Sequence, residues 1–156
     1  MTQDRNTLDL VLTRIFNASR EKVWEAWTNP EQLKKWWGPK DFTAPEITSD
    51  LQKGGVYLYC VQAPNGQKIY ITGVFKEIKP PEKLIFTGSF ADEHGNPVSG
   101  SYYGMDGHES GMQTVEFEDL GDETKVTLRQ EGLPPEEIDG EGKSWNQSFD
   151  KLAQIL

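Results

Sequence analysis

The chain has 156 residues, with 16 basic and 25 acidic side chains and a net charge of −9 at pH 7. This length favours a single domain comprising residues 1–156, and the negative charge argues against a nucleic acid as the main partner. One cysteine, Cys60, excludes an intrachain disulfide and suits a reducing compartment. No segment approaches the ~20 apolar residues of a membrane span, and Asp9 and Arg14 interrupt the first apolar segment, where a secretory signal would be continuous. We therefore expect a cytoplasmic protein without membrane insertion.

The first third of the sequence predicts a strand followed by two short helices. Residues 8–16 alternate between apolar and polar side chains, as a half-buried strand does. Ser19 is a suitable N-cap for a helix that carries tryptophans on one side. Asn29 followed by proline favours the start of a second helix, which we expect to run to the Trp-Trp pair at residues 36–37 and to end at Gly38.

From Phe42 onward the hydrophobic period changes to two, and turn residues recur at intervals of about ten positions. This pattern is typical of an antiparallel meander. A glycine-rich loop interrupts it at residues 91–111, and loops of that length are often functional. The expected strands cover residues 42–52, 56–61, 68–78, 83–90, 112–119 and 124–131.

The last segment is predicted to be one long amphipathic helix, because Trp145, Phe149, Leu152 and Leu156 fall on one helical stripe. Strands that follow one another without intervening helices indicate an antiparallel sheet and an α+β fold. We expect a helix-grip architecture, in which a curved antiparallel sheet of about seven strands surrounds the C-terminal helix, with two short helices after the first strand. Any volume that this helix does not fill becomes a cavity.

Several short motifs follow one another along the chain: NPEQLKKWWGPKDF, DLQKGG, PNGQ, GVFKEIKPPEKLIFT, TVEFEDLGDETKVTL and SWNQSFDKLAQIL. In this order they resemble the START-like helix-grip superfamily, in the branch named for the activator of the heat-shock-protein ATPase. The resemblance extends from about Thr7 to Leu156 and implies the same fold, with a cavity between the sheet and the last helix. Members of the family include binders of small hydrophobic molecules, cyclases and chaperone activators. One departure is Ser144, where the family usually has glycine before the tryptophan of the last helix.

The common catalytic and cofactor motifs are missing: the sequence has no HExxH, CxxC, GxSxG or GxGxxG. We therefore expect no cofactor and no metal site. His94 and His108 are the two imidazoles, both in the glycine-rich loop, where exposed loop residues are favoured over metal ligands or an acid–base pair. Cys60 lies in an apolar strand, which favours a small buried side chain over a reactive thiol.

Aromatic side chains are the candidate ligand-binding residues, because aromatic walls with few polar anchors are typical of ligand pockets. The five Trp, seven Phe and five Tyr also build the core, so each aromatic residue has two alternative roles. Alternation along residues 56–61 separates two faces but leaves open which one meets the helix. The candidate ligand-binding residues are Trp37, Tyr57, Tyr59, Tyr70, Phe86, Trp145 and Phe149.

The leading functional hypothesis is a binding domain, rather than an enzyme, that holds a small hydrophobic ligand between the sheet and the last helix. The alternative is a protein-interaction domain whose partner is a chaperone, as the resemblance implies. The third possibility is a cyclase or hydrolase that acts inside the cavity with His94 or His108.

Overall fold

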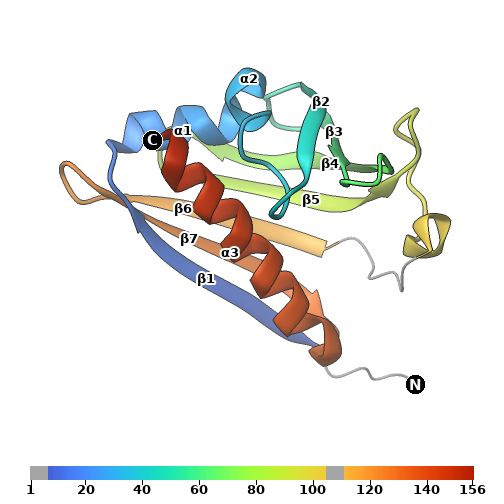
Figure 1. Ribbon diagram of the computed structural model, residues 1–156. Coiled ribbons are helices and arrows are strands. Elements are labelled where there is room, and N and C mark those ends of the chain that lie inside the picture. The colour runs from blue at the N-terminus through green and yellow to red at the C-terminus, as the bar shows by residue number, and fades with distance from the viewer. Residues whose placement is uncertain (1–6, 105–110) are drawn as a thin grey trace.

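The structure is a computed structural model that describes residues 7–104 and 111–156. The described residues form one sheet of seven strands, three α-helices and two short 3-10 helices (Figure 1). In chain order these are β1 (Leu8–Phe16), α1 (Arg20–Thr28), α2 (Pro30–Leu33), β2 (Thr43–Ser49), β3 (Val56–Gln62), β4 (Lys68–Lys79), β5 (Lys83–Ala91), η1 (Gly100–Tyr103), β6 (Gly111–Asp119), β7 (Thr124–Leu133), η2 (Pro135–Glu137) and α3 (Ile138–Ile155).

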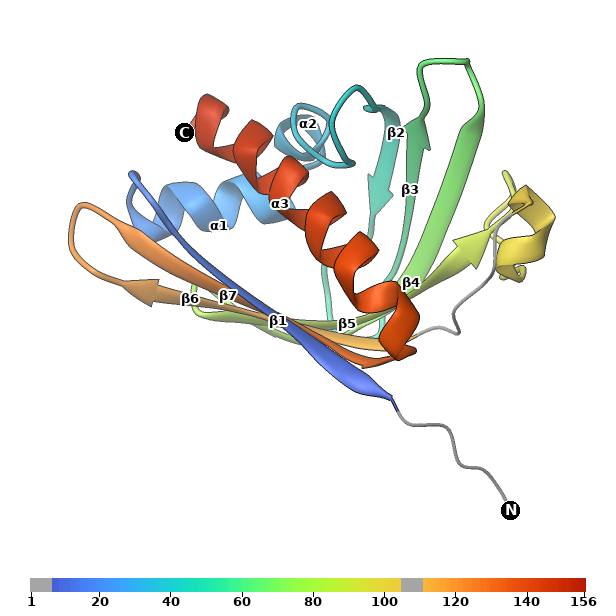
Figure 2. The same ribbon diagram turned by 60° about the horizontal axis from the view of Figure 1, so that its bottom comes forward.

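The strands follow the order β1-β7-β6-β5-β4-β3-β2, and every neighbouring pair is antiparallel. The sheet curls, and α3 lies across its concave face with α1 and α2 on the same side, towards one end (Figure 2). This confirms the predicted α+β helix-grip fold. Within the part of the chain that the structure describes, no helix is both long and apolar enough to cross a membrane.

The two faces of β3 pack against different parts of the protein. Tyr57 and Tyr59 belong to the main core on the concave face, together with residues of all three helices. Cys60 points to the other face, where it forms a small second cluster with Tyr70 and Ala91. The helix therefore meets the tyrosine side of the strand, which the alternation alone left open.

Both predicted N-caps are present, but the second helix is shorter than expected. The Ser19 hydroxyl accepts a hydrogen bond from the Lys22 amide, and Asn29 Oδ1 accepts one from the Glu31 amide. The prediction that α2 runs to the Trp-Trp pair was wrong, because the helix ends at Leu33. The pair lies in the following turn, where burial of the Trp36 ring and its hydrogen bond to a carbonyl of α1 take precedence over helix continuation.

Strand β2 is also shorter than predicted, at both ends. The expected strand at residues 42–52 overlaps the turn at residues 50–55, which is stabilised by a hydrogen bond of 2.7 Å from the Gly55 amide to the Gln52 carbonyl. The last residues of the predicted strand therefore belong to the turn that connects β2 to β3.

The centre of the core is an aromatic cluster around Trp27 of α1. This ring is 3% exposed and lies with its centroid 4.8 to 6.2 Å from the centroids of five other aromatic rings. Those rings come from the turn after α2, from β6 and from α3, so one side chain joins the short helices to both the sheet and the last helix. The five rings are Trp36, Trp37, Phe117, Trp145 and Phe149.

Strand β4 depends on a glycine at position 73. A Cβ atom there would lie 1.9 Å from the Thr87 carbonyl oxygen and 2.7 Å from Cε2 of Tyr57, whereas a Cβ at Gly140 of α3 would meet nothing within 4 Å. We expect Gly73→Ala to lower the free energy of unfolding by about 2–3 kcal/mol through overpacking. Gly140→Ala should raise it by up to about 1 kcal/mol, because alanine favours the helix. Urea denaturation of both variants tests this pair, and equal stabilities would contradict the register of β4 and β5.

Candidate functional site

A cavity of about 280 Å³ lies between the sheet, the N-terminal half of α3 and the turn after α2. This volume is just below the roughly 300–1,000 Å³ that is typical of ligand pockets. Its surface is mostly apolar, and polar side chains come from β6, β7 and α3. The lining residues are Trp37, Gly38, Pro39, Phe42, Tyr57, Val61, Ile69, Ile71, Phe86, Gly88, Ser89, Phe90, Gln113, Gln130, Glu141, Ser144, Trp145 and Ser148.

Four of the seven candidate ligand-binding residues line this cavity: Trp37, Tyr57, Phe86 and Trp145. They come from the turn after α2, from β3, from β5 and from α3, so the fold brings together aromatic side chains that are far apart in the sequence. The rings of Trp37 and Trp145 meet edge to face, with centroids 5.4 Å apart.

The other three candidates lie elsewhere. Tyr59 and Phe149 are buried in the main core, directly behind the cavity wall: Tyr59 is 5.1 Å from Trp37 and Phe149 is 5.9 Å from Trp145, between ring centroids. Tyr70 lies on the outer face of β4, because side chains alternate along a strand, and its hydroxyl donates to the Glu46 carboxylate.

The cavity is open under one half of α3 because the helix carries two adjacent stripes of different size. Trp145, Phe149 and Leu152 form the apolar stripe and pack into the core. Ser144 and Ser148 form a neighbouring stripe of small residues, and both line the cavity. The small serine side chains leave the space beneath them empty. Farther along the helix, the large side chains of the apolar stripe fill the corresponding space.

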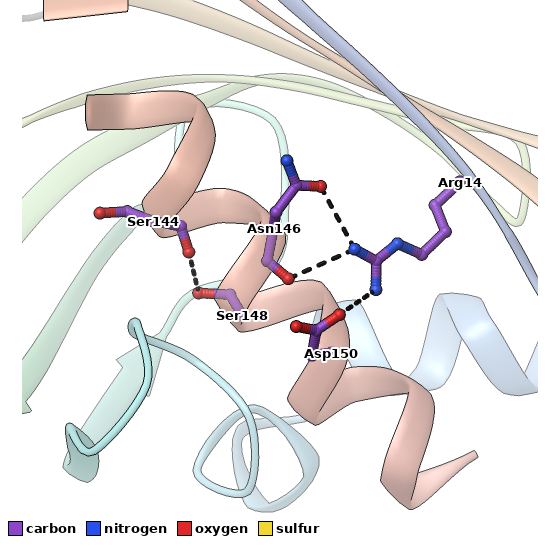
Figure 3. A network of polar contacts seen from close by, with 5 residues as sticks. All are labelled: Arg14, Ser144, Asn146, Ser148 and Asp150. Atoms are coloured by element: carbon purple, nitrogen blue, oxygen red, sulfur yellow. Dashed lines mark hydrogen bonds and ion pairs between the residues drawn. The ribbon is translucent and has the colours of Figure 1, made fainter. Parts of the chain in front are cut away.

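Arg14 of β1 binds α3 on the side away from the two serines (Figure 3). Its guanidinium donates to Asp150 Oδ1 at 2.8 Å and to Asn146 Oδ1 at 3.2 Å, and it lies 5.6 Å from the centroid of the Phe149 ring. The Ser148 hydroxyl donates within the helix, to the Ser144 carbonyl oxygen. This arrangement fixes the rotation of α3, so that the serine stripe faces the cavity.

The rim of the cavity is attached to α3 through Lys151. Its Nζ donates to the carbonyl oxygens of Gly38, Pro39 and Phe42, at 2.9, 3.3 and 3.0 Å. Burial lowers the pKa of Lys151 below its ordinary value. Because all three acceptors belong to the turn after α2, one side chain holds the entire rim segment against the helix.

Two glutamines on neighbouring strands form the polar end of the cavity. Gln113 of β6 and Gln130 of β7 are direct partners in the antiparallel register, and both line the cavity. Gln130 is 6% exposed, and its Oε1 accepts a hydrogen bond of 3.2 Å from Nε1 of Trp145. Sequence analysis missed both glutamines, although an uncharged polar residue on the inward face of each of two paired apolar strands is a detectable signal.

His94 and the cysteine are not part of this site. His94 is exposed in the turn after β5, where its backbone amide binds Asp92, and it is not among the lining residues; His108 lies outside the described residues. Cys60 is fully buried on the outer face, and burial raises the pKa of its thiol. Within residues 7–104 and 111–156, no group of three His, Cys, Asp or Glu side chains is placed to bind a metal ion.

Burial also affects the tyrosines at the cavity. It raises the pKa of Tyr57, and that of Tyr59, well above the ordinary value of 10.0, with a smaller contribution to Tyr57 from Tyr59 itself. The Tyr57 hydroxyl donates to the Thr87 carbonyl oxygen at 2.6 Å. The neutral phenols are therefore the form that the folded protein stabilises.

This pKa shift predicts a loss of stability in alkali. An acid whose pKa is higher in the folded state contributes stability below its unfolded pKa, and that contribution is lost as the pH rises above it. We expect the free energy of unfolding, measured with urea between pH 8 and 11, to fall steeply above about pH 10. Tyr57→Phe should show a shallower fall, because one of the buried phenols is gone. Parallel pH profiles for the two proteins would contradict this assignment.

Comparison with known proteins identifies the family. The family described as Activator of Hsp90 ATPase homolog 1-like protein matches residues 17–156. No curated protein matches the chain.

Three solved structures illustrate the similarity. A protein from Arthrobacter aurescens is 27% identical with a TM-score of 0.81, over 96% of this chain and 87% of that chain. One from Chromobacterium violaceum is 26% identical with a TM-score of 0.79, over 94% of this chain and 95% of that chain. One from Nitrosomonas europaea is 25% identical with a TM-score of 0.78, over 96% and 94%. The family match covers most of the sequence and agrees with the fold, so the chain belongs to the family of Activator of Hsp90 ATPase homolog 1-like proteins.

Proposed function

We propose that this protein binds a small hydrophobic or amphipathic molecule in the cavity under the N-terminal half of α3, and that residues 1–156 act as one binding domain. The observation that carries this proposal is the cavity of about 280 Å³ itself. Protein interiors are close-packed, and voids much larger than a water molecule are few. A volume of this size with aromatic walls and a few polar groups has the composition of a ligand pocket.

The proposed contacts follow from the placement of the aromatic residues. Trp37, Phe86 and Trp145 would contact the apolar body of the ligand, with Tyr57 beside them. Tyr59 and Phe149 would act indirectly, because their rings lie behind the wall and hold Trp37 and Trp145 in position. Tyr70, on the outer face of the sheet, has no part in the proposed binding.

The test is to fill the cavity from either wall. Ser144→Phe places a ring in it from α3, and Ile71→Trp does so from β4; Ala153→Phe adds a ring at an exposed position of α3. Ligand-observed NMR with a library of aromatic metabolites and short-chain lipids should detect binders of the unmodified protein. The two cavity variants should weaken their binding at least tenfold, and the Ala153 variant should not, provided that circular dichroism shows folded protein.

Two results would contradict the proposal. One is the absence of any binder for the unmodified protein across the library. The other is a binder whose affinity stays the same in both folded cavity variants, because that molecule would then bind elsewhere.

The alternative function is docking on a chaperone, which the family description suggests. Docking would depend on the surface of the domain rather than on its cavity. A pull-down with the unmodified protein and with Ser144→Phe separates the two functions: capture of a chaperone in stoichiometric amount by both proteins would favour docking, whereas ligand binding predicts no such partner.

A further inference from the structure

The polar end of the cavity contains an acceptor that no described residue satisfies. Oε1 of Gln113 is buried and has no hydrogen-bond partner in the described part of the chain. Buried polar atoms are nearly always hydrogen-bonded, and an unmatched acceptor favours any guest that donates to it. Because Gln113 lines the cavity, the missing donor can come from a ligand.

The neighbouring residue Gly88 makes room for this amide. A Cβ at position 88 would lie 2.8 Å from Nε2 of Gln113 and 3.2 Å from the Tyr57 hydroxyl. The nitrogen end of the amide therefore lies over the glycine. The last torsion of a glutamine side chain is broad, so rotation about it can turn the oxygen towards a donor in the cavity.

The oxygen of the second glutamine, Gln130, already accepts a hydrogen bond from Trp145. The indole N–H of Trp145 can only donate, so its bond to Gln130 fixes Oε1 as the atom that faces Trp145. Of the two paired amides, Gln113 is thus the one whose acceptor remains for a ligand.

The charges around the cavity restrict the ligand further. Among the described lining residues, Glu141 is the one charged side chain, and no Lys or Arg contributes to the lining. The nearby ammonium of Lys151 is occupied by three carbonyl oxygens of the rim. A carboxylate or phosphate in this cavity would lose its hydration without gaining a cation, which disfavours anionic ligands.

We infer that the cavity selects a neutral ligand with an apolar body and a hydrogen-bond donor, a hydroxyl or an amide N–H, that pairs with Gln113 Oε1. This inference rests on the proposed function. It narrows the ligand class from hydrophobic molecules in general to uncharged donors, such as phenols, alcohols and amides, and it assigns Gln113 as a specificity-determining residue.

Matched probes test the donor directly. The pair 2-naphthol and 2-methoxynaphthalene has one ring system and differs in the donor; naphthalene has no polar group, and 2-naphthoate carries a negative charge at pH 7. Dissociation constants come from chemical-shift titration of the full chain. One net hydrogen bond corresponds to a preference of about five- to tenfold. We expect 2-naphthol to bind more tightly than its methyl ether by this factor, and 2-naphthoate to bind more weakly than naphthalene.

The matched variants assign the preference to one residue. Gln113→Leu should bind 2-naphthol and its methyl ether equally while still binding naphthalene, and Gln113→Met serves the same purpose if the leucine variant does not fold. Gln154→Leu makes the same chemical change at an exposed position of α3 and should keep the full preference. The side-chain amide resonances of Gln113, identified by their loss in the variant, should shift with 2-naphthol and not with naphthalene.

The outcomes separate this inference from the function on which it rests. If naphthalene binds but the hydroxyl gives no preference, or the preference survives in Gln113→Leu, the donor inference is wrong and the binding function stands. Tightest binding of 2-naphthoate would likewise overturn the inference alone. If none of the four probes binds, the proposed function fails for aromatic ligands and the inference fails with it.

Discussion

The packing of Trp27 against aromatic rings from three directions is the interaction on which the rest of the structure depends. Its ring lies 6.1 Å from Trp145 and 6.2 Å from Phe149 of α3, and 6.0 Å from Phe117 of β6, between centroids. Each such aromatic pair adds about 0.5–1.5 kcal/mol to the free energy gained from burial. The cluster holds the C-terminal half of α3 at a fixed height above the sheet. The N-terminal half of the helix then crosses a part of the sheet that it faces with the small side chains of Ser144 and Ser148.

The cavity is therefore a consequence of where large and small residues lie along one helix. Ser144 and Ser148 occupy the stripe that faces it, and Gly142, one turn from the helix start, is buried where a Cβ would lie 3.5 Å from Leu10 Cδ1 of β1. Close contact with β1 at Gly142 and the Lys151 bonds to the rim support the helix on either side of the cavity. Ser144 and Ser148 line the cavity without belonging to the aromatic cluster, whereas Trp145 of the same helix belongs to both.

Most of the fold could be predicted from the sequence, because period-two alternation, turn residues and the apolar stripe of the last helix are local signals. The length of α2 could not, since the end of that helix depends on the burial of Trp36 against α1, which is a tertiary contact. Alternation separated Tyr57 from Cys60 but could not say which faced the helix. The sequence supplied the aromatic part of the candidate site, while Gln113 and Gln130 become a pair only through the register of β6 and β7. Ser144 and Ser148 are four positions apart, so the serine stripe is detectable at helical spacing beside the apolar stripe.

Ligand binding as proposed requires that the cavity stays open in the unliganded protein. Xenon enters apolar cavities without needing a hydrogen bond, so it reports the volume independently of any ligand chemistry. Methyl NMR spectra of the protein under xenon pressure should show shifts at Val61, Ile69 and Ile71, which line the cavity, and little change at Val126 and Leu128, which are fully buried in the core. Shifts of the same small size at all five residues would show a closed interior and contradict the account.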